Sequence, residues 1–183
     1  MSILSPLHFY ILRHRNHILF YGLLLFFFLV PSLANAQPKK PQGAVFDIKV
    51  LKVIDGDTIR LEDGRLVRYL GIDAPEVRRK VGGKWVYDPE PFSEEATALN
   101  RKLVEGKTVR LQIDPVRPRD RFGRLLAYVF VETDRKYFVN VEMLKQGLAK
   151  THKLPLGTEH RKMLWSAEQM AWGNKRGVWS EKK

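Results

Sequence analysis

A predicted β-hairpin between Val53 and Glu76 most constrains how this 183-residue chain can fold. Two runs rich in β-branched and large apolar residues, 59–62 and 66–72, flank the dipeptide Asp63-Gly64. An Asp-Gly pair supplies the positive φ angles that a tight hairpin turn needs. The two runs are therefore expected to pair as antiparallel strands.

Two aspartates lie at the ends of these strands. Asp57 lies just before the first strand and Asp73 just after the second. Antiparallel pairing places both carboxylates at the same end of the hairpin, where their oxygens can share one hard cation. Taken singly, each of these segments is better explained as an ordinary turn, because Asp and Gly are common in turns.

The remaining sequence predicts further strands and helices around this hairpin. Alternating or continuous apolar runs predict strands over 45–54, 107–114 and 125–131. Ser93 is expected to cap a helix that Gly106 ends, Asn140 a short helix through Lys145, and Thr158 a helix from about 159 to 172. The expected order along the chain is three strands, a helix, two strands and two helices. This order fits a small barrel with helices packed outside.

The segment 77–92 between the hairpin and the first helix is predicted to be an irregular, basic surface loop. Gly82-Gly83 and two downstream prolines oppose a regular element. The loop could touch a substrate bound beside it, but Trp85 or Tyr87 is more commonly expected to tuck into the core.

The N-terminus has the pattern of a secretory signal peptide. Arg13 and Arg15 precede an apolar run over 18–30, and Ala34-Asn35-Ala36 follows as a small-residue cleavage pattern. The apolar run is shorter than the roughly 18 residues of a membrane span. We expect residues 1–36 to be a signal peptide, 37–43 a linker and 44–183 the folded domain of a secreted or periplasmic protein, with an uncleaved anchor as the alternative.

Charge and cysteine content limit the binding partners and the kinds of site that this protein can have. The 32 basic and 20 acidic residues give a net charge of +12, which suits a polyanionic partner such as nucleic acid. The same charge is equally consistent with binding to anionic lipid or with a role in solubility alone. There are no cysteines, which excludes disulfides, thiolate zinc sites and a cysteine nucleophile.

Several motifs together resemble a known family. They are Asp-Gly-Asp-Thr at 55–58, Arg68 before a short apolar run, Gly-Ile-Asp-Ala-Pro-Glu at 71–76, and Asp-Arg-Phe-Gly-Arg-Leu-Leu-Ala-Tyr at 120–128. In this order they resemble the thermonuclease, or staphylococcal-nuclease-like, family of phosphodiesterases, over about residues 45–180. The resemblance implies an α+β fold: a small five-stranded OB-fold β-barrel with three helices outside, a barrel often used to bind nucleic acids.

The resemblance also implies roles for individual residues. Hydrolysis of a phosphodiester needs a Lewis acid, fixed guanidinium groups for the phosphate oxygens, and a carboxylate that positions or activates water. The implied Ca²⁺ ligands are Asp57, Asp73 and the main-chain carbonyl of Ala74. Glu76 is the implied water-positioning residue, and Arg68 and Arg124 are the implied phosphate clamps.

Two further residues are judged from their local sequence. Asp55, ahead of Gly56, is expected to accept turn N–H groups in preference to binding the metal directly. Phe122 and the segment 151–155 stand where relatives carry tyrosines, which leaves the base preference open. Phe122 could stack on a base, although burial is the commoner fate of Phe.

The leading hypothesis is a secreted, calcium-dependent and monomeric nuclease. By resemblance it would hydrolyse DNA and RNA, both internally and from the ends, to give 3′-phosphate ends. A catalytically silent OB-fold module that binds nucleic acid or a protein partner is the alternative. A basic protein tethered by an uncleaved anchor, with the barrel kept as a scaffold, is the third reading.

Overall fold

The computed structural model describes residues 43–132, 136–153 and 160–180. The expected signal peptide, the linker except Gly43, and the Thr158 cap lie outside these ranges. In the described part of the chain, no helix is long and apolar enough to cross a membrane.

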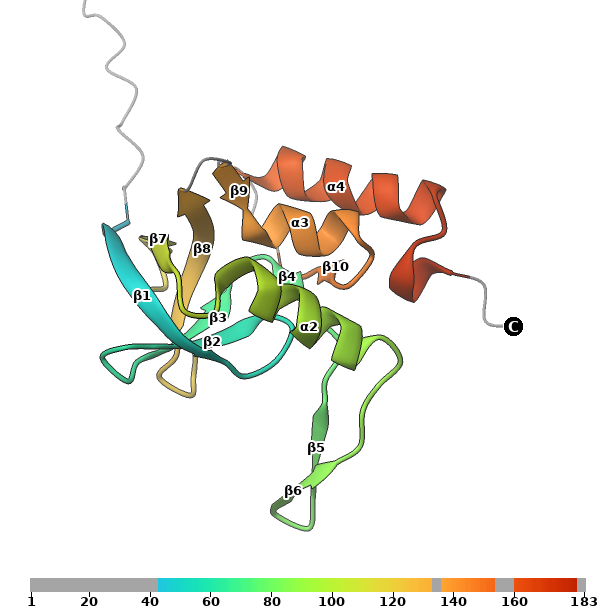
Figure 1. Ribbon diagram of the computed structural model, residues 1–183, viewed down its shortest axis with the longest axis horizontal. Helices are drawn as coiled ribbons and strands as arrows, with labels where there is room; N and C mark the ends of the chain where they lie inside the picture. Colours follow the sequence, from blue (N-terminus) through green and yellow to red (C-terminus); the bar gives the residue numbers. More distant parts are fainter. Residues whose placement is uncertain (1–42, 133–135, 154–159, 181–183) are drawn as a thin grey trace, which may run out of the picture. The chain divides into compact units, whose positions relative to one another are not determined.

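Five strands close into a barrel (Figure 1). Their order is β3-β2-β1-β7-β8, and β3 pairs in parallel with β8 to close the barrel while the other neighbours are antiparallel. The bounds are β1 Val45–Val53, β2 Thr58–Leu61, β3 Leu66–Tyr69, β7 Thr108–Ile113 and β8 Leu125–Glu132. The expected α+β, five-stranded OB-fold barrel is thereby confirmed.

Alternation of apolar and polar residues explains which side of each strand is buried. In β7, Val109, Leu111 and Ile113 point into the barrel. Successive side chains of a strand point to opposite faces, so the polar residues between them lie on the outside. Strand β8 is buried over most of its length, because α3 packs against it from outside the barrel.

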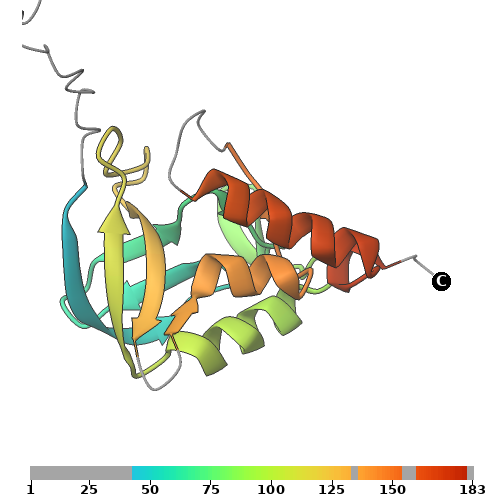
Figure 2. The ribbon, with the colours of Figure 1, turned by 90° about the horizontal axis from the view of Figure 1, so that it is seen from above.

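Three helices lie together on one side of the barrel (Figure 2). They are α2 (Ser93–Val104), which contacts β1, α3 (Val139–Lys145), which contacts β8, and α4 (Arg161–Gly173), which packs on α3. A short 3-10 helix, η1 (Gly177–Trp179), follows α4. Their burial against one another and the barrel supplies most of their stability, since short isolated helices are marginal in water.

Three further short strands differ from the expectation, and the expected strand over 66–72 is divided: β3 ends at Tyr69, and Ile72 belongs to a separate strand. Strand β9 (Lys136–Phe138) extends the barrel sheet beside β8. Strand β4 (Ile72–Asp73) pairs with β10 (Lys150–Thr151), with Asp73 opposite Lys150. This second pairing fixes the backbone of the segment that carries Asp73.

The prediction of an irregular loop over 77–92 is wrong in part. Strands β5 (Arg78–Val81) and β6 (Lys84–Tyr87) form an antiparallel hairpin. Gly82 and Gly83 both have positive φ, 55° and 84°, and two successive positive φ angles make the turn that joins tightly paired strands. Trp85 and Tyr87 do not enter the core, because they are 68% and 60% exposed.

Two expected helix caps are also wrong. Helix α2 begins at Ser93 itself, and its N-cap is Phe92, with a φ of 69° and no side-chain cap bond. Helix α3 begins at Val139, before Asn140. The buried Asn140 accepts the Val129 N–H at 3.0 Å and donates to the Leu70 carbonyl at 2.9 Å. A cap motif in the sequence cannot reveal that a distant backbone needs the same side chain.

Replacing Asn140 with Ala is expected to lower the free energy of unfolding by about 2–6 kcal/mol, because two buried backbone groups lose their partner at roughly 1–3 kcal/mol each. Chemical denaturation measures the change, with the exposed Gln169→Ala on α4 as control. A midpoint for Asn140→Ala equal to that of the control would contradict this role.

Candidate active site

The turn between β1 and β2 is held by hydrogen bonds to its own side chains and to α2. Asp55 Oδ1 accepts the Asp57 N–H at 3.0 Å, which confirms the expected role of Asp55 as a turn carboxylate. The buried Asn100 of α2 donates to the Asp55 carbonyl at 2.9 Å and accepts from the Tyr69 hydroxyl at 2.7 Å. One amide therefore ties the turn to both the helix and β3.

Gly56 lets this turn approach its neighbours closely. A Cβ at Gly56 would lie 2.6 Å from the Cβ of Ala74 and 2.8 Å from the Cβ of Ala96. Neither contact can relax by rotating a flexible side chain. The turn, the segment after Asp73 and helix α2 therefore meet at a point with no room for any side chain.

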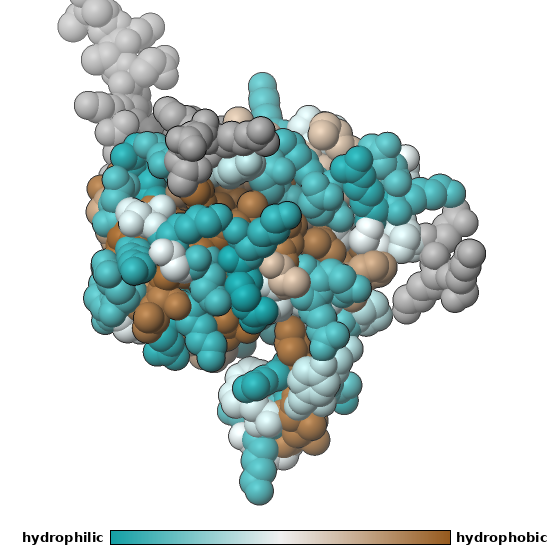
Figure 3. All heavy atoms as spheres, in the orientation of Figure 1, coloured by the Kyte–Doolittle hydropathy of each residue, from teal (hydrophilic) through white to brown (hydrophobic). Residues whose placement is uncertain are grey.

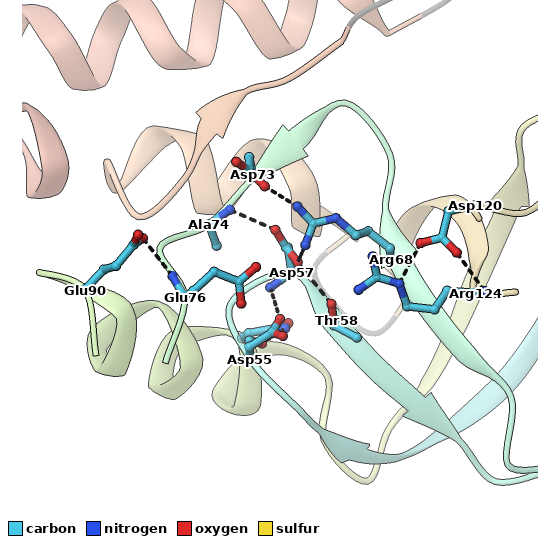
Figure 4. Close-up of polar contacts among 11 residues, drawn as sticks. Asp55, Asp57, Thr58, Arg68, Asp73, Ala74, Glu76, Glu90, Asp120 and Arg124 are labelled. Carbon is cyan, nitrogen blue, oxygen red and sulfur yellow. Dashed lines mark hydrogen bonds and ion pairs between the residues drawn. The ribbon is translucent and has the colours of Figure 1, made fainter. Parts of the chain in front are cut away.

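The strand pairing brings Asp57 and Asp73 to one end of the β2–β3 hairpin, as expected. Thr58 pairs with Arg68, and the Tyr69 N–H donates to the Asp57 carbonyl at 2.8 Å. Arg68 Nη1 donates to Asp57 Oδ1 at 2.5 Å, and its Nη2 forms an ion pair with Asp73 Oδ1 (Figure 4). A single guanidinium thus spans the two carboxylates.

Asp57 is the more deeply placed of the two. Its side chain is 1% exposed, against 49% for Asp73. Its Oδ2 accepts the Ala74 N–H at 2.8 Å, and its Oδ1 also accepts from the Thr58 hydroxyl at 3.1 Å. The structure therefore places the Ala74 N–H against Asp57.

Burial dominates the electrostatics of Asp57. It raises the pKa of this carboxyl to about 8, with the nearby charge of Asp55 adding to the effect and Arg68 opposing it. Burial also disfavours the charged form of Arg68, but Asp57 and Asp73 outweigh it and the pKa of Arg68 is raised. The site is short of positive charge.

This shortage fits a hard cation. Asp57 and Asp73 present oxygens close enough to share one guanidinium, and carboxylate oxygens are the ligands that Ca²⁺ prefers. Within the described ranges, no group of three or more His, Cys, Asp or Glu side chains could hold a metal. The remaining ligands of such a cation would thus be main-chain carbonyls or water.

Glu76 lies beside this pair on the segment after β4. Its N–H donates to Glu90 Oε2 at 3.0 Å, and the Glu90 N–H donates to the Glu76 carbonyl at 2.9 Å. The pKa of Glu76 is raised, first by burial and then by Asp55, with Arg68 opposing. A carboxylate with a raised pKa is a better proton acceptor than an ordinary glutamate.

Arg124 reaches the site from the segment before β8. Parallel pairing sets Arg68 opposite Leu126, and residues two apart on a strand face the same side, so Arg124 is directed to the side of Arg68 (Figure 4). Arg124 Nε donates to Asp120 Oδ2 at 2.6 Å. Phe122 is 69% exposed with Arg124 5.4 Å from its ring centre, so the burial judged commoner for Phe122 is wrong.

Sequence reasoning missed several supporting residues. Glu90, which positions Glu76, lies in a loop with no pattern that marks it. Asp120, which positions Arg124, is the first residue of the family motif over 120–128, but the motif implied no role for it. Asn100 did carry a signal: it interrupts the apolar face of α2 between Ala96 and Val104, and a polar residue at a buried helical position usually has a specific partner.

A cavity of about 380 Å³ adjoins the segment from Asp73 to Pro75. Beyond these residues it is lined by Glu90, Pro91, Phe92, Lys150, Val178 and Ser180. Phe92 adopts the left-handed φ noted above, and such strained residues cluster at functional sites. The cavity gives the site an open flank next to Asp73.

The barrel and its charged site define the class, an α+β protein of the OB-fold type with carboxylates and guanidinium groups gathered at one hairpin end. Residues 66–181 match the family model of the staphylococcal nuclease homologues. The chain is 32% identical over 152 residues to the endonuclease YncB of Bacillus subtilis (strain 168), covering 81% of this chain and 68% of that protein.

Two further relatives extend the comparison. The thermonuclease of Staphylococcus intermedius is 32% identical over 133 residues, 71% of this chain and 74% of that protein. The SPbeta prophage-derived endonuclease YokF of B. subtilis (strain 168) is 33% identical over 139 residues, which is 74% of this chain but 44% of YokF. The chain belongs to the staphylococcal nuclease family, and its enzyme class is that of the nucleases, which are hydrolases.

Replacing Gly56 with Ala is expected to destabilise the protein by about 1–3 kcal/mol, because the added methyl group overpacks a contact with no free space. The same change at Gly173, where a Cβ meets nothing within 4 Å, is the matched control and should be neutral or slightly stabilising. Thermal or chemical unfolding of the two variants measures the difference, and equal stability would refute the close contact.

Proposed function

We propose that this protein is a calcium-dependent nuclease whose active site is built from Asp57, Asp73, Ala74, Glu76, Arg68 and Arg124. The observation that carries the proposal is the single Arg68 guanidinium held between Asp57 and Asp73, with Glu76 electrostatically coupled to the same group. Carboxylates for a cation, guanidinium groups for a phosphate and a basic carboxylate occur there together. The family motifs support the same assignment.

Calcium, when bound at Asp57, Asp73 and the carbonyl of Ala74, would supply a Lewis acid that polarises a phosphate oxygen. Arg68 and Arg124 hold the phosphate oxygens, on which negative charge grows as water attacks phosphorus. Both guanidinium groups already lie in ion pairs, with Asp57 and Asp120 respectively. These carboxylates fix the guanidinium groups before substrate arrives.

Glu76 positions the attacking water and accepts its proton. The reciprocal bonds with Glu90 hold the main chain of Glu76 in place, and its raised pKa makes the carboxylate a stronger base. The water attacks in line with the departing 5′-oxygen, so the products carry 3′-phosphate ends. The resemblance to the thermonuclease family supports this choice of leaving oxygen.

The substrates proposed are DNA and RNA, cleaved by a monomer after export. Phe122 is exposed on a loop with two arginines near its ring, and stacking on an aromatic ring accepts any base. The signal-peptide pattern over 1–36 supports a secreted or periplasmic location. The intact mass of the exported protein tests whether that segment is removed.

Calcium is expected to raise the melting temperature of the wild-type protein, and Asp57→Asn and Asp73→Asn should each weaken this shift. A ligand at a hundred times its dissociation constant stabilises the folded state by about 2.7 kcal/mol. Asp47→Asn is the control, because Asp47 also forms an ion pair with an arginine but is an exposed residue of β1 outside the candidate site. A stronger response to magnesium than to calcium, or an unchanged shift in Asp57→Asn, would argue against this metal site.

Glu76→Gln and Arg124→Ala are each expected to lose at least roughly a hundredfold in turnover while still binding single-stranded DNA. Both residues act chiefly on the transition state, whereas the wider basic surface supplies affinity for the ground state. Initial rates at saturating calcium, together with oligonucleotide binding in a chelator, measure the two effects separately.

Glu62→Gln and Arg60→Ala, exposed and toward the opposite end of the β2–β3 hairpin, are the controls and should keep full turnover. A wild-type protein that binds DNA but cuts no faster than Glu76→Gln would replace the nuclease with the silent OB-fold binder.

A further inference from the structure

The β5–β6 hairpin stands clear of the barrel (Figures 1 and 3). Every residue of both strands is exposed. Its sequence combines basic residues with Trp85 and Tyr87, whose exposed fractions are 68% and 60%. Exposed aromatic residues gathered in one place usually mark a binding surface.

The strand register sorts these side chains onto two different faces. Arg78 pairs with Tyr87 and Lys80 pairs with Trp85, and residues directly opposite each other in an antiparallel pair share a face. By the alternation along each strand, these four residues lie on one face. We name this surface, made of Arg78, Lys80, Trp85 and Tyr87, the aromatic face.

The other face is different in kind. It carries Arg79 opposite Val86 and Val81 opposite Lys84. The two faces therefore have the same number of basic residues, but only one has aromatic rings beside them. Substitutions on the two faces can therefore separate the contribution of charge to ligand binding from the contribution of aromatic stacking.

The base of the hairpin is tied to the active site. The hairpin begins two residues after Glu76, and the bonds between Glu76 and Glu90 close the loop that carries it. The Tyr87 hydroxyl donates to Glu94 of α2. Four residues of a strand extend about 13 Å, so the hairpin reaches outward from the site by roughly that distance.

We propose that the aromatic face binds the single-stranded part of the nucleic-acid substrate that extends beyond the scissile phosphate. Cations next to flat rings match a strand in which phosphates alternate with bases, because every base can stack on an aromatic ring. This inference rests on the proposed nuclease function. Continuity with Glu76 favours a nucleic acid over an anionic lipid surface, the other partner that tryptophan beside basic residues suits.

Binding of a fluorescent single-stranded oligonucleotide in a chelator, where no cleavage occurs, tests the aromatic face. Trp85→Ala is expected to weaken binding by about 5- to 150-fold, the range for loss of one stacked base, and Trp85→Phe should retain most of the affinity. Val86→Ala, on the opposite face, is the control and should change affinity less than twofold. All these side chains are exposed, so the fold should not change.

A charge-matched pair gives a second readout. Lys80→Gln should reduce the slope of log affinity against log salt by about 0.7, the value for one phosphate contact on a single strand. Lys84→Gln removes the same charge from the opposite face and should leave the slope almost unchanged. Equal effects of the two lysine variants would overturn the assignment of the face.

Cleavage rates distinguish failure of this inference from failure of the proposed function. Trp85→Ala should raise KM for a long single strand without lowering kcat, and should leave cleavage of a trinucleotide unchanged. A wild-type protein that cleaves neither substrate rejects the nuclease function, while the binding tests still decide the aromatic face. Loss by Trp85→Ala of binding to vesicles of equal parts phosphatidylcholine and phosphatidylserine, with oligonucleotide binding intact, would assign the face to lipid and overturn the proposal.

Discussion

The ionic contact between Asp57 and Arg68 is the interaction on which the rest of the site depends. Asp57 is almost completely buried, and a buried carboxylate is costly unless it is paired and hydrogen-bonded. Arg68, the Ala74 N–H and the Thr58 hydroxyl all bond to it. Because these partners come from β2, β3 and the segment after β4, pairing Asp57 also fixes where those segments meet.

The barrel allows several carboxylates to lie close together at the candidate site. Asp55, Asp73 and Glu76 lie near Asp57, and burial together with this neighbouring negative charge raises the pKa values of Asp57 and Glu76. Such an arrangement opposes folding, and it persists because strands held by many hydrogen bonds surround it. A bound cation would relieve the same repulsion, which connects the stability of the protein to its proposed chemistry.

Net charge alone does not locate the surface that meets a polyanion. Arg110 pairs with Asp47 and Glu132, and Arg65 pairs with Asp63, so part of the positive charge is used within the fold. The β5–β6 hairpin and the loop around Phe122 instead present cations next to exposed aromatic rings. Both surfaces adjoin the candidate site from different segments of the chain, which suits a nucleic-acid strand that crosses it.

The sequence by itself predicted the five barrel strands and the main helices, and its resemblance to the family implied the residues of the candidate site. Period-two alternation, the Asp63-Gly64 turn and the spacing of Asp57 and Asp73 are local signals, and local geometry follows from them directly. Only the tertiary structure decided that Gly82-Gly83 forms a hairpin turn, that Asn140 serves the β8 and Leu70 backbone in place of a helix cap, and that Asn100 and Glu90 hold the site. The roles of Asn140, Asn100 and Glu90 depend on partners in other segments of the chain. The Gly82-Gly83 hairpin depends on whether Trp85 and Tyr87 are exposed or buried, and a short stretch of sequence settles neither.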